Sequence, residues 1–94
     1  VNPALVDDLS AGFPGVIDAA AFGLERDNGI AELGLAVKAE PTCDLKALDQ
    51  ALRRQLITGF PTTFWRVTEI PRNRMGKVER VLLAQAFESA RRES

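Results

Sequence analysis

Residues 44–57 most constrain what this chain can fold into, because they carry a strongly one-sided helical pattern. Leucines recur there every three or four residues and mark one face of a helix: Leu45, Leu48, Leu52 and Leu56. Asp44 precedes them as a helix N-cap, and Gly59 and Pro61 follow as helix-ending residues. A helix with one apolar face buries that face against another element. The pattern therefore predicts a helix packed on a second layer.

Two stretches before this helix predict strands. Residues 16–22 are apolar on both alternating faces apart from Asp18, which is typical of a strand covered on both sides, although three alanines leave a helix open. Residues 33–39 alternate between large apolar residues and glycine, alanine or lysine, which predicts a half-buried strand. The stretch 23–29 between them is polar and turn-rich.

Three further elements complete the predicted fold. A short helix over 3–11 begins with Asn2 as its N-cap, and residues 64–70 are rich in aromatic and β-branched residues, which predicts a third strand. A last helix is expected from about 78 to 90, with this buried stripe: Leu82, Leu83, Ala86, Phe87 and Ala90. The fold class is α/β (α+β), a small mixed sheet of about three strands with helices packed on it, in the order α-β-β-α-β-α. Residues 1–94 form a single domain in this interpretation.

The composition excludes several classes of function. The chain has no histidine, which removes the commonest metal ligand and the commonest general base. Its one cysteine, Cys43, excludes an internal disulfide and a cysteine-rich zinc site, and we expect it to be an inert small residue. Twelve basic and thirteen acidic residues give a net charge of −1, so we expect no nucleic-acid partner. No apolar run approaches a membrane span, and we expect a cytoplasmic protein.

Charge is nevertheless unevenly distributed along the chain. Residues 1–32 hold six acids and one base, whereas residues 66–80 hold five bases and two acids. A local basic stretch on a near-neutral domain predicts one patch that faces an anion. The plainer alternative is a solvated loop, and a free-standing module that binds RNA or another anionic partner is a third interpretation. In the acidic part, Asp7 and Asp8 are expected on a solvated helix face.

The segment 71–80 carries the chemistry: Pro-Arg-Asn-Arg-Met-Gly-Lys-Val-Glu-Arg. Gly76 can take backbone angles closed to other residues, so it can turn the chain and project Lys77. We expect Lys77 at the start of the last helix, where the helix N-terminus adds a partial positive charge. Such a site favours a phosphate or carboxylate. It is not a Walker A loop, which has a second glycine and a Ser/Thr after the lysine.

The pattern Pro71-x4-Gly76-Lys77-x2-Arg80 resembles the C-terminal lysine motif of the adenylate-forming superfamily, which includes AMP-forming acyl-CoA synthetases, luciferases and peptide-synthetase adenylation domains. Residues 13–20 are similar to the family's strand motif "hPGVxDAAV", residues 23–29 to the turn after it, and residues 1–7 to the end of its hinge-side motif. Leu5 stands where the family more often has glutamate. These four ordered matches cover nearly the whole chain, and we expect it to be part of a longer polypeptide.

The resemblance implies that residues 1–94 are the mobile C-terminal lid of an ATP-dependent acyl-CoA synthetase of fatty acid metabolism. A large N-terminal domain of the same polypeptide is then expected to bind most of ATP and Mg²⁺, and the isolated lid to be inactive, with no tightly bound cofactor and no metal. Lys77 is expected to bridge the substrate carboxylate and the ATP α-phosphate, where negative charge builds up. The lid is then expected to rotate and present another face to CoA. An adenylation domain of a peptide synthetase or related ligase is the alternative.

The same resemblance assigns roles around Lys77. Pro71, Gly76 and Arg80 complete the motif, with Arg80 either structural or a ligand contact. Arg72 and Arg74 are candidate contacts for CoA or phosphate. Lys77 also resembles the position at which bacterial acyl-CoA synthetases are acetylated, so a protein acetyltransferase is a candidate partner, and acetylation removes the charge that adenylation needs. Outside the motif, the aromatic pair Phe64 and Trp65 is expected in the core or at a domain interface.

Overall fold

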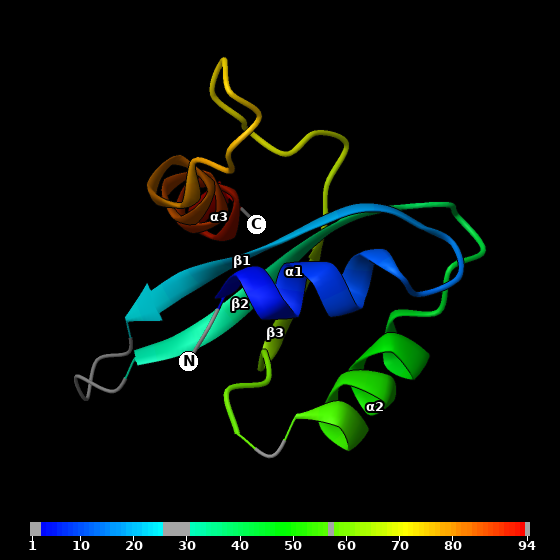
Figure 1. Cartoon of the computed structure of the whole chain (residues 1–94). Helices are drawn as coiled ribbons and strands as arrows, with labels where there is room; N and C mark the ends of the chain where they lie inside the picture. Colours follow the sequence, from blue (N-terminus) through cyan, green and yellow to red (C-terminus); the bar gives the residue numbers. More distant parts are fainter. Residues whose placement is uncertain (1–2, 26–30, 57, 94) are drawn as a thin grey trace.

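The protein is described by a computed structural model that covers residues 3–25, 31–56 and 58–93. Its elements in chain order are α1 (Pro3–Ala11), β1 (Val16–Glu25), β2 (Ala31–Ala39), α2 (Leu45–Gln55), β3 (Thr63–Arg66) and α3 (Arg80–Glu93) (Figure 1). The predicted α+β class and the order α-β-β-α-β-α are confirmed. The N-cap predicted at Asn2 and most of the turn predicted at 23–29 lie outside the described residues.

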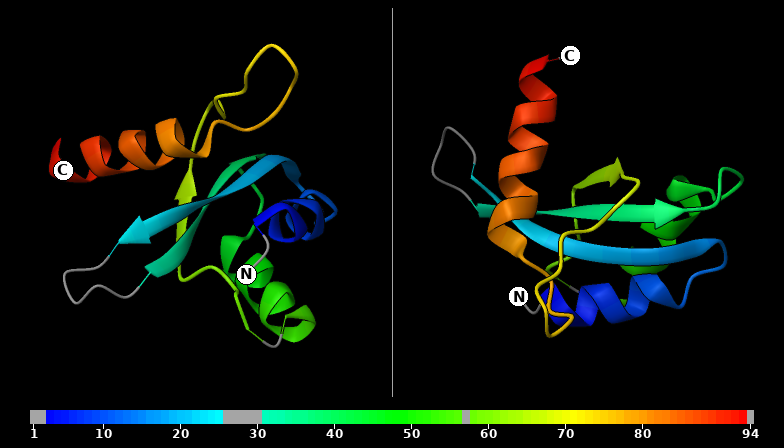
Figure 2. Two further views of the ribbon diagram at one scale, coloured as in Figure 1. Left: turned by 60° about the vertical axis from the view of Figure 1, so that its left-hand side comes forward. Right: turned by 90° about the horizontal axis from the view of Figure 1, so that it is seen from above.

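The three strands form one mixed sheet in the order β1-β2-β3. β1 pairs antiparallel with β2, from Val16 opposite Ala39 to Glu25 opposite Ala31, and β3 pairs parallel with β2. Figure 2 shows α1 and α2 on one face of this sheet and α3 across the other. The sheet therefore has one layer of helix on each side, with β1 at one edge.

A hydrophobic core lies on each face of the sheet. The core under α1 and α2 includes Val6, Leu35, Leu48 and Leu52, and the core under α3 includes Ala20, Phe22, Ala36 and Leu83. The alternating residues of β1 divide between the two cores, as predicted from its two apolar faces. Phe64 packs against the first core and Trp65 against the second, which confirms their predicted core placement.

The prediction that β2 is half-buried was wrong, because residues 34–37 are buried on both faces of the strand. Position 34 requires a glycine because the Phe22 ring occupies the space that a side chain would need. A Cβ atom at Gly34 would lie 2.5 Å from Cζ of Phe22, a separation that real Cβ atoms do not show. The Phe22 ring also contacts Phe87, with 5.3 Å between ring centroids. Small residues in β2 therefore mark close packing rather than exposure to water.

Several predicted strand and helix ends were wrong. β1 continues to Glu25, so residues 23–25 are strand rather than part of the predicted turn, because they pair with β2. β3 ends at Arg66 rather than at Ile70, since residues 67–70 leave the sheet and carry Ile70 into the core under α3. The last helix begins at Arg80 rather than near Val78, because Val78 instead forms an antiparallel bridge with Arg72. The N-cap prediction for α2 is confirmed, since the Asp44 carboxylate accepts the N–H of Lys46 at 2.9 Å.

The buried stripe predicted for α3 is only partly right. Leu83 is 1% exposed and Phe87 packs beside it in the core under α3. Leu82, however, is 49% exposed, and Ala86 is exposed as well. α3 therefore rests on the sheet along the line of Leu83 and Phe87. No helix in the described ranges is long and apolar enough to span a membrane.

Candidate functional site

Residues 71–79 form a tight hairpin that projects from the sheet between β3 and α3. Its arms are joined by the Arg72–Val78 bridge, and the N–H of Asn73 donates to the carbonyl of Lys77 at 2.9 Å. At the turn, the N–H of Gly76 donates to the carbonyl of Asn73 at 3.0 Å, and Gly76 has a φ of +83°. A glycine in this left-handed conformation closes a three-residue hairpin loop. The turning role predicted for Gly76 is confirmed.

Lys77 lies on the returning arm of this hairpin and not at the start of a helix as predicted. The Arg72–Val78 bridge keeps residues 77 and 78 extended, so the first turn of α3 forms only from Arg80. The partial positive charge of the α3 N-terminus therefore does not belong to the Lys77 site. The Lys77 side chain is exposed, and its own N–H donates to the Asn73 side-chain oxygen at 3.1 Å.

Three of the five bases in the basic stretch are held within the fold: Arg66, Arg72 and Arg80. Arg66 donates to the backbone carbonyls of Glu40 and Cys43. Within the described residues, no hydrogen bond or ion pair is recorded for the side chains of Arg74 and Lys77, and both are exposed. The patch predicted to face an anion therefore reduces to these two side chains, which we call the hairpin cations.

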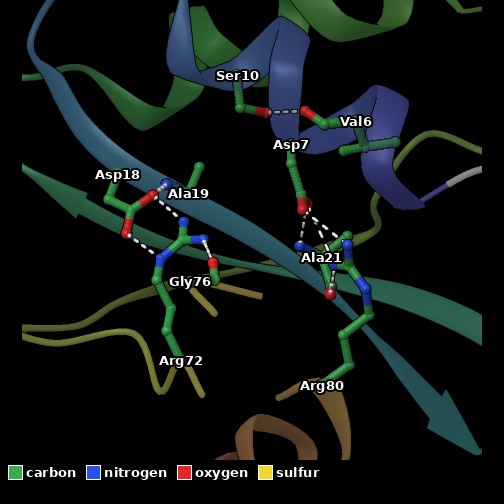
Figure 3. A network of polar contacts seen from close by, with 9 residues as sticks. All are labelled: Val6, Asp7, Ser10, Asp18, Ala19, Ala21, Arg72, Gly76 and Arg80. Carbon is green, nitrogen blue, oxygen red and sulfur yellow. Dashed lines mark hydrogen bonds and ion pairs between the residues drawn. The ribbon is translucent and has the colours of Figure 1, made fainter. Parts of the chain in front are cut away.

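Arg72 connects the hairpin to β1. Its guanidinium forms a two-pronged ion pair with the Asp18 carboxylate, with an Nη2–Oδ1 distance of 2.7 Å, and its Nη1 donates to the carbonyl of Gly76 at 2.8 Å (Figure 3). The hydrogen bond to Asp18 raises the pKa of Arg72 above its ordinary value, so the guanidinium stays charged wherever the protein is folded. All three nitrogens of the guanidinium have a protein partner. A contact from Arg72 to CoA or phosphate stays a prediction.

Arg80 is paired with Asp7 across the edge of the sheet, as Figure 3 shows. The Arg80 Nη2–Asp7 Oδ2 distance is 2.8 Å, and Nη1 donates to the carbonyl of Ala21 at 2.7 Å. The N–H of Ala21 donates to Asp7 at 2.6 Å. Because β1 is an edge strand, the two side chains satisfy backbone groups that no neighbouring strand can reach. The Asp7–Arg80 pair therefore joins α1, β1 and α3.

The expectation that Asp7 is solvated was wrong, since its side chain is only 14% exposed. Asp8, next to it, is exposed as expected. Cys43 is buried, and its thiol faces the carbonyl of Pro14 at 3.7 Å, in agreement with the inert role predicted for it. Asp7 and Asp18 are the residues near the site that sequence reasoning missed. Their partners lie 73 and 54 positions away, so no local pattern marks the contacts.

Comparisons with known proteins agree on what this fold resembles. No protein-family model matches the chain. A fatty acid–[acyl-carrier-protein] ligase of Mycobacterium marinum is 35% identical over 95 residues, and so is a medium/long-chain-fatty-acid–[acyl-carrier-protein] ligase of Mycobacterium tuberculosis; each match covers 92% of this chain. The chain is therefore similar to one part of ligases that act on fatty acids. It matches their C-terminal part and spans 17–18% of the length of these two curated relatives.

Solved structures of adenylate-forming ligases share the fold. A Mycobacterium tuberculosis fatty acyl CoA synthetase superposes with a TM-score of 0.83 at 22% identity and covers 94% of this chain. A Brucella canis acyl-CoA synthetase has a TM-score of 0.82 at 23% identity and covers 97% of this chain. In both cases the match is to 18% of the solved chain. These likenesses support the arrangement of sheet, helices and hairpin described above.

Two sequence motifs of the adenylate-forming ligases meet at the hairpin in this structure. Asp18 belongs to the strand motif of residues 13–20, and Arg72 belongs to the lysine motif of residues 71–80. Their ion pair fixes one motif on the other. In the strand motif, Gly15 has a φ of +89°, a conformation in which other residues are strained, and a Cβ there would make a tight contact of 3.0 Å with Cβ of Cys43. In the described part of the chain, no group of three or more acidic or cysteine side chains could hold a metal ion.

Proposed function

We propose that this chain is the C-terminal lid domain of an ATP-dependent, AMP-forming ligase that activates a carboxylic acid. In this proposal, Lys77 supplies the positive charge that stabilises the adenylation step. The observation that carries the proposal is the exposed Lys77 side chain on the hairpin, because the nearby Arg72 and Arg80 are instead held in ion pairs with Asp18 and Asp7. The names of the curated relatives support a fatty acid as the substrate class. Pro71 and Gly76 then serve to shape the hairpin.

The chemistry suits a lysine. When a carboxylate oxygen attacks the α-phosphorus of ATP, the bond to pyrophosphate breaks and negative charge builds on the phosphate oxygens. A compact ammonium with three rotatable donors can bridge the attacking carboxylate and the α-phosphate at that moment. It stabilises the charge without giving up a proton. Lys77 is the group on this chain that we assign to this task.

A large N-terminal part of the same polypeptide is proposed to bind ATP, the carboxylic acid and Mg²⁺. Because the described residues include no group of three or more acidic or cysteine side chains that could hold a metal ion, we assign Mg²⁺ to that N-terminal part. The acceptor is proposed to be a thiol. The names of the solved neighbours favour CoA, whereas the names of the curated relatives favour an acyl-carrier protein, and a rotation of the lid would bring either thiol to the acyl-adenylate.

Regulation and location extend the same proposal. Lys77 is exposed, so a protein acetyltransferase could reach it, and its acetylation would remove the charge and stop adenylation. Arg74, the second hairpin cation, is proposed to contact the phosphates of CoA. We place this activity in the cytoplasm, within fatty acid metabolism.

The reaction class is tested by product analysis with the full-length enzyme that contains this chain. The enzyme is incubated with ATP, Mg²⁺ and a series of fatty acids, and with CoA or a pantetheine-bearing carrier protein. We expect AMP and pyrophosphate to form in equal amounts with the acyl thioester. With hydroxylamine in place of the thiol, a hydroxamate should report the acyl-adenylate. Release of ADP and phosphate instead of AMP and pyrophosphate would contradict the proposal.

A further inference from the structure

We propose that Arg72 is a positioning residue for Lys77, which acts by holding the Gly76–Lys77 peptide group against β1 through Asp18. This inference rests on the proposed function of Lys77. It assigns to Arg72 a role distinct from the CoA or phosphate contact predicted from its charge.

Both polar groups of the Gly76–Lys77 peptide, the carbonyl and the N–H, make hydrogen bonds. The carbonyl of Gly76 accepts from Arg72 Nη1 at 2.8 Å, and the N–H of Lys77 donates to the Asn73 side-chain oxygen at 3.1 Å. The two side chains come from the opposite arm of the hairpin. Together they fix the plane from which the Lys77 side chain departs.

Apolar packing does not hold the turn of this hairpin. A Cβ at Gly76 would meet no atom within 4 Å, and Met75 is 83% exposed. The contacts recorded for the turn are hydrogen bonds that converge on Asn73 and Arg72. The orientation of Lys77 therefore depends on a few polar groups rather than on a core.

Asp18 is the fixed end of this arrangement. Its Oδ1 accepts the N–H of Ala19 at 2.9 Å as well as Arg72 Nη2 at 2.7 Å (Figure 3). Asp18 follows an irregularity in the pairing of β1 with β2, which lies between Val16 and Asp18. The planar guanidinium of Arg72 can meet the carboxylate with two prongs and reach the Gly76 carbonyl with its third nitrogen. A lysine at this position has one nitrogen and cannot make all three contacts.

The stability of the domain is not expected to depend strongly on this ion pair, because both side chains are about one-third exposed. The ion pair between Arg53 and Asp49 on α2 has similar exposure, with an Nε–Oδ1 distance of 2.9 Å, and does not touch the hairpin. Arg53→Gln is therefore a matched control for Arg72→Gln, since it removes the same charge from the same kind of surface pair.

The test measures ATP–pyrophosphate exchange in the full-length enzyme. We expect Arg72→Gln to lower kcat for exchange by about 10- to 100-fold with little change in KM for ATP, because the lysine is displaced rather than a ligand lost. Arg72→Lys should not restore the rate, and Asp18→Asn should lower it in the same direction. Arg53→Gln should stay at the wild-type rate. In a Lys77→Ala background, Arg72→Gln should cause no further loss.

Two kinetic results would overturn the inference. A further loss in the Lys77→Ala background together with a raised KM for ATP would mean that Arg72 contacts phosphate itself. A wild-type rate for Arg72→Gln would mean that Lys77 does not need the contacts of Arg72 with Gly76 and Asp18, which we call the clamp.

Amide hydrogen exchange separates this inference from the proposed function. Arg72→Gln should speed exchange at the N–H groups of Gly76 and Lys77 at least about tenfold and leave α2 unchanged. If Lys77→Ala leaves adenylation intact, the proposed function fails, yet faster exchange at these two amides would still support the clamp. Unchanged exchange at both amides would overturn the clamp itself.

Discussion

In the full-length enzyme, Lys77→Ala is expected to slow adenylation by about 100- to 1,000-fold, a loss of the size seen when one donor to a developing negative charge is removed. Thioester formation from supplied acyl-adenylate is expected to stay within about twofold of the wild-type rate, because the phosphoryl chemistry is then complete. The first half-reaction is measured by ATP–pyrophosphate exchange and the second by release of AMP from acyl-adenylate and the thiol. The two half-reactions should therefore separate.

Arg74→Ala is the matched control, because Arg74 is the other hairpin cation and its loss removes the same charge from the same hairpin. We expect adenylation by this variant to stay close to the wild-type rate. A slower second half-reaction with CoA, and a raised KM for CoA, would support the phosphate contact proposed for Arg74. Equal loss of both half-reactions in Lys77→Ala would contradict the role assigned to Lys77.

Leu83→Ala is expected to lower the free energy of unfolding by about 2–5 kcal/mol, whereas Leu82→Ala should lower it by less than about 1 kcal/mol. The two leucines are neighbours on α3, and the substitution changes helix propensity equally at both. Leu83 is 1% exposed in the core under α3, while Leu82 is 49% exposed. The difference between the variants therefore isolates burial. Urea unfolding of the 94-residue chain, followed by circular dichroism, measures both values.

The outcome of this pair tests the orientation of α3 on the sheet. Equal destabilisation by the two variants would mean that α3 is rotated about its axis relative to the structure described. The orientation matters for function because α3 carries Arg80 to Asp7 at the edge of β1. A rotated helix could not keep that contact and would move the arm that bears Lys77.

The parts of the fold that could be predicted from sequence are those with a regular local pattern. The leucine repeat and Asp44 predicted α2 and its N-cap, and the double apolar face of residues 16–22 predicted a strand that is covered on both sides. The predicted end of β3 and the predicted start of α3 were wrong, because backbone pairing with residues outside each element decides both. Val78 is held extended by Arg72, a contact that the helical pattern of residues 78–90 does not reveal.

The candidate site divides in the same way. The glycine before Lys77 predicted a sharp turn, and its φ of +83° agrees with that prediction. The contacts of Asp7 with Arg80 and of Asp18 with Arg72 could not be predicted, because in sequence both acids look like ordinary surface charge. Leu82 and Leu83 both fit a helical stripe, and only the packing of α3 on the core that contains Phe22 decides which of the two is buried. These contacts and this burial depend on packing between elements that are far apart in sequence, which a local pattern does not contain.

The most direct test of the central claim restores a cation at position 77 by chemical modification. Lys77→Cys in the full-length enzyme should lose ATP–pyrophosphate exchange, and alkylation with bromoethylamine should recover it, because the product carries an ammonium at nearly the length of lysine. Alkylation with iodoacetamide, which adds a neutral amide, should recover nothing. Wild-type enzyme treated in parallel controls for other cysteines, and Cys43 is buried. Recovery by the charged reagent alone is the predicted result, whereas equal recovery by both reagents, or none by either, would contradict a charge-dependent role for Lys77.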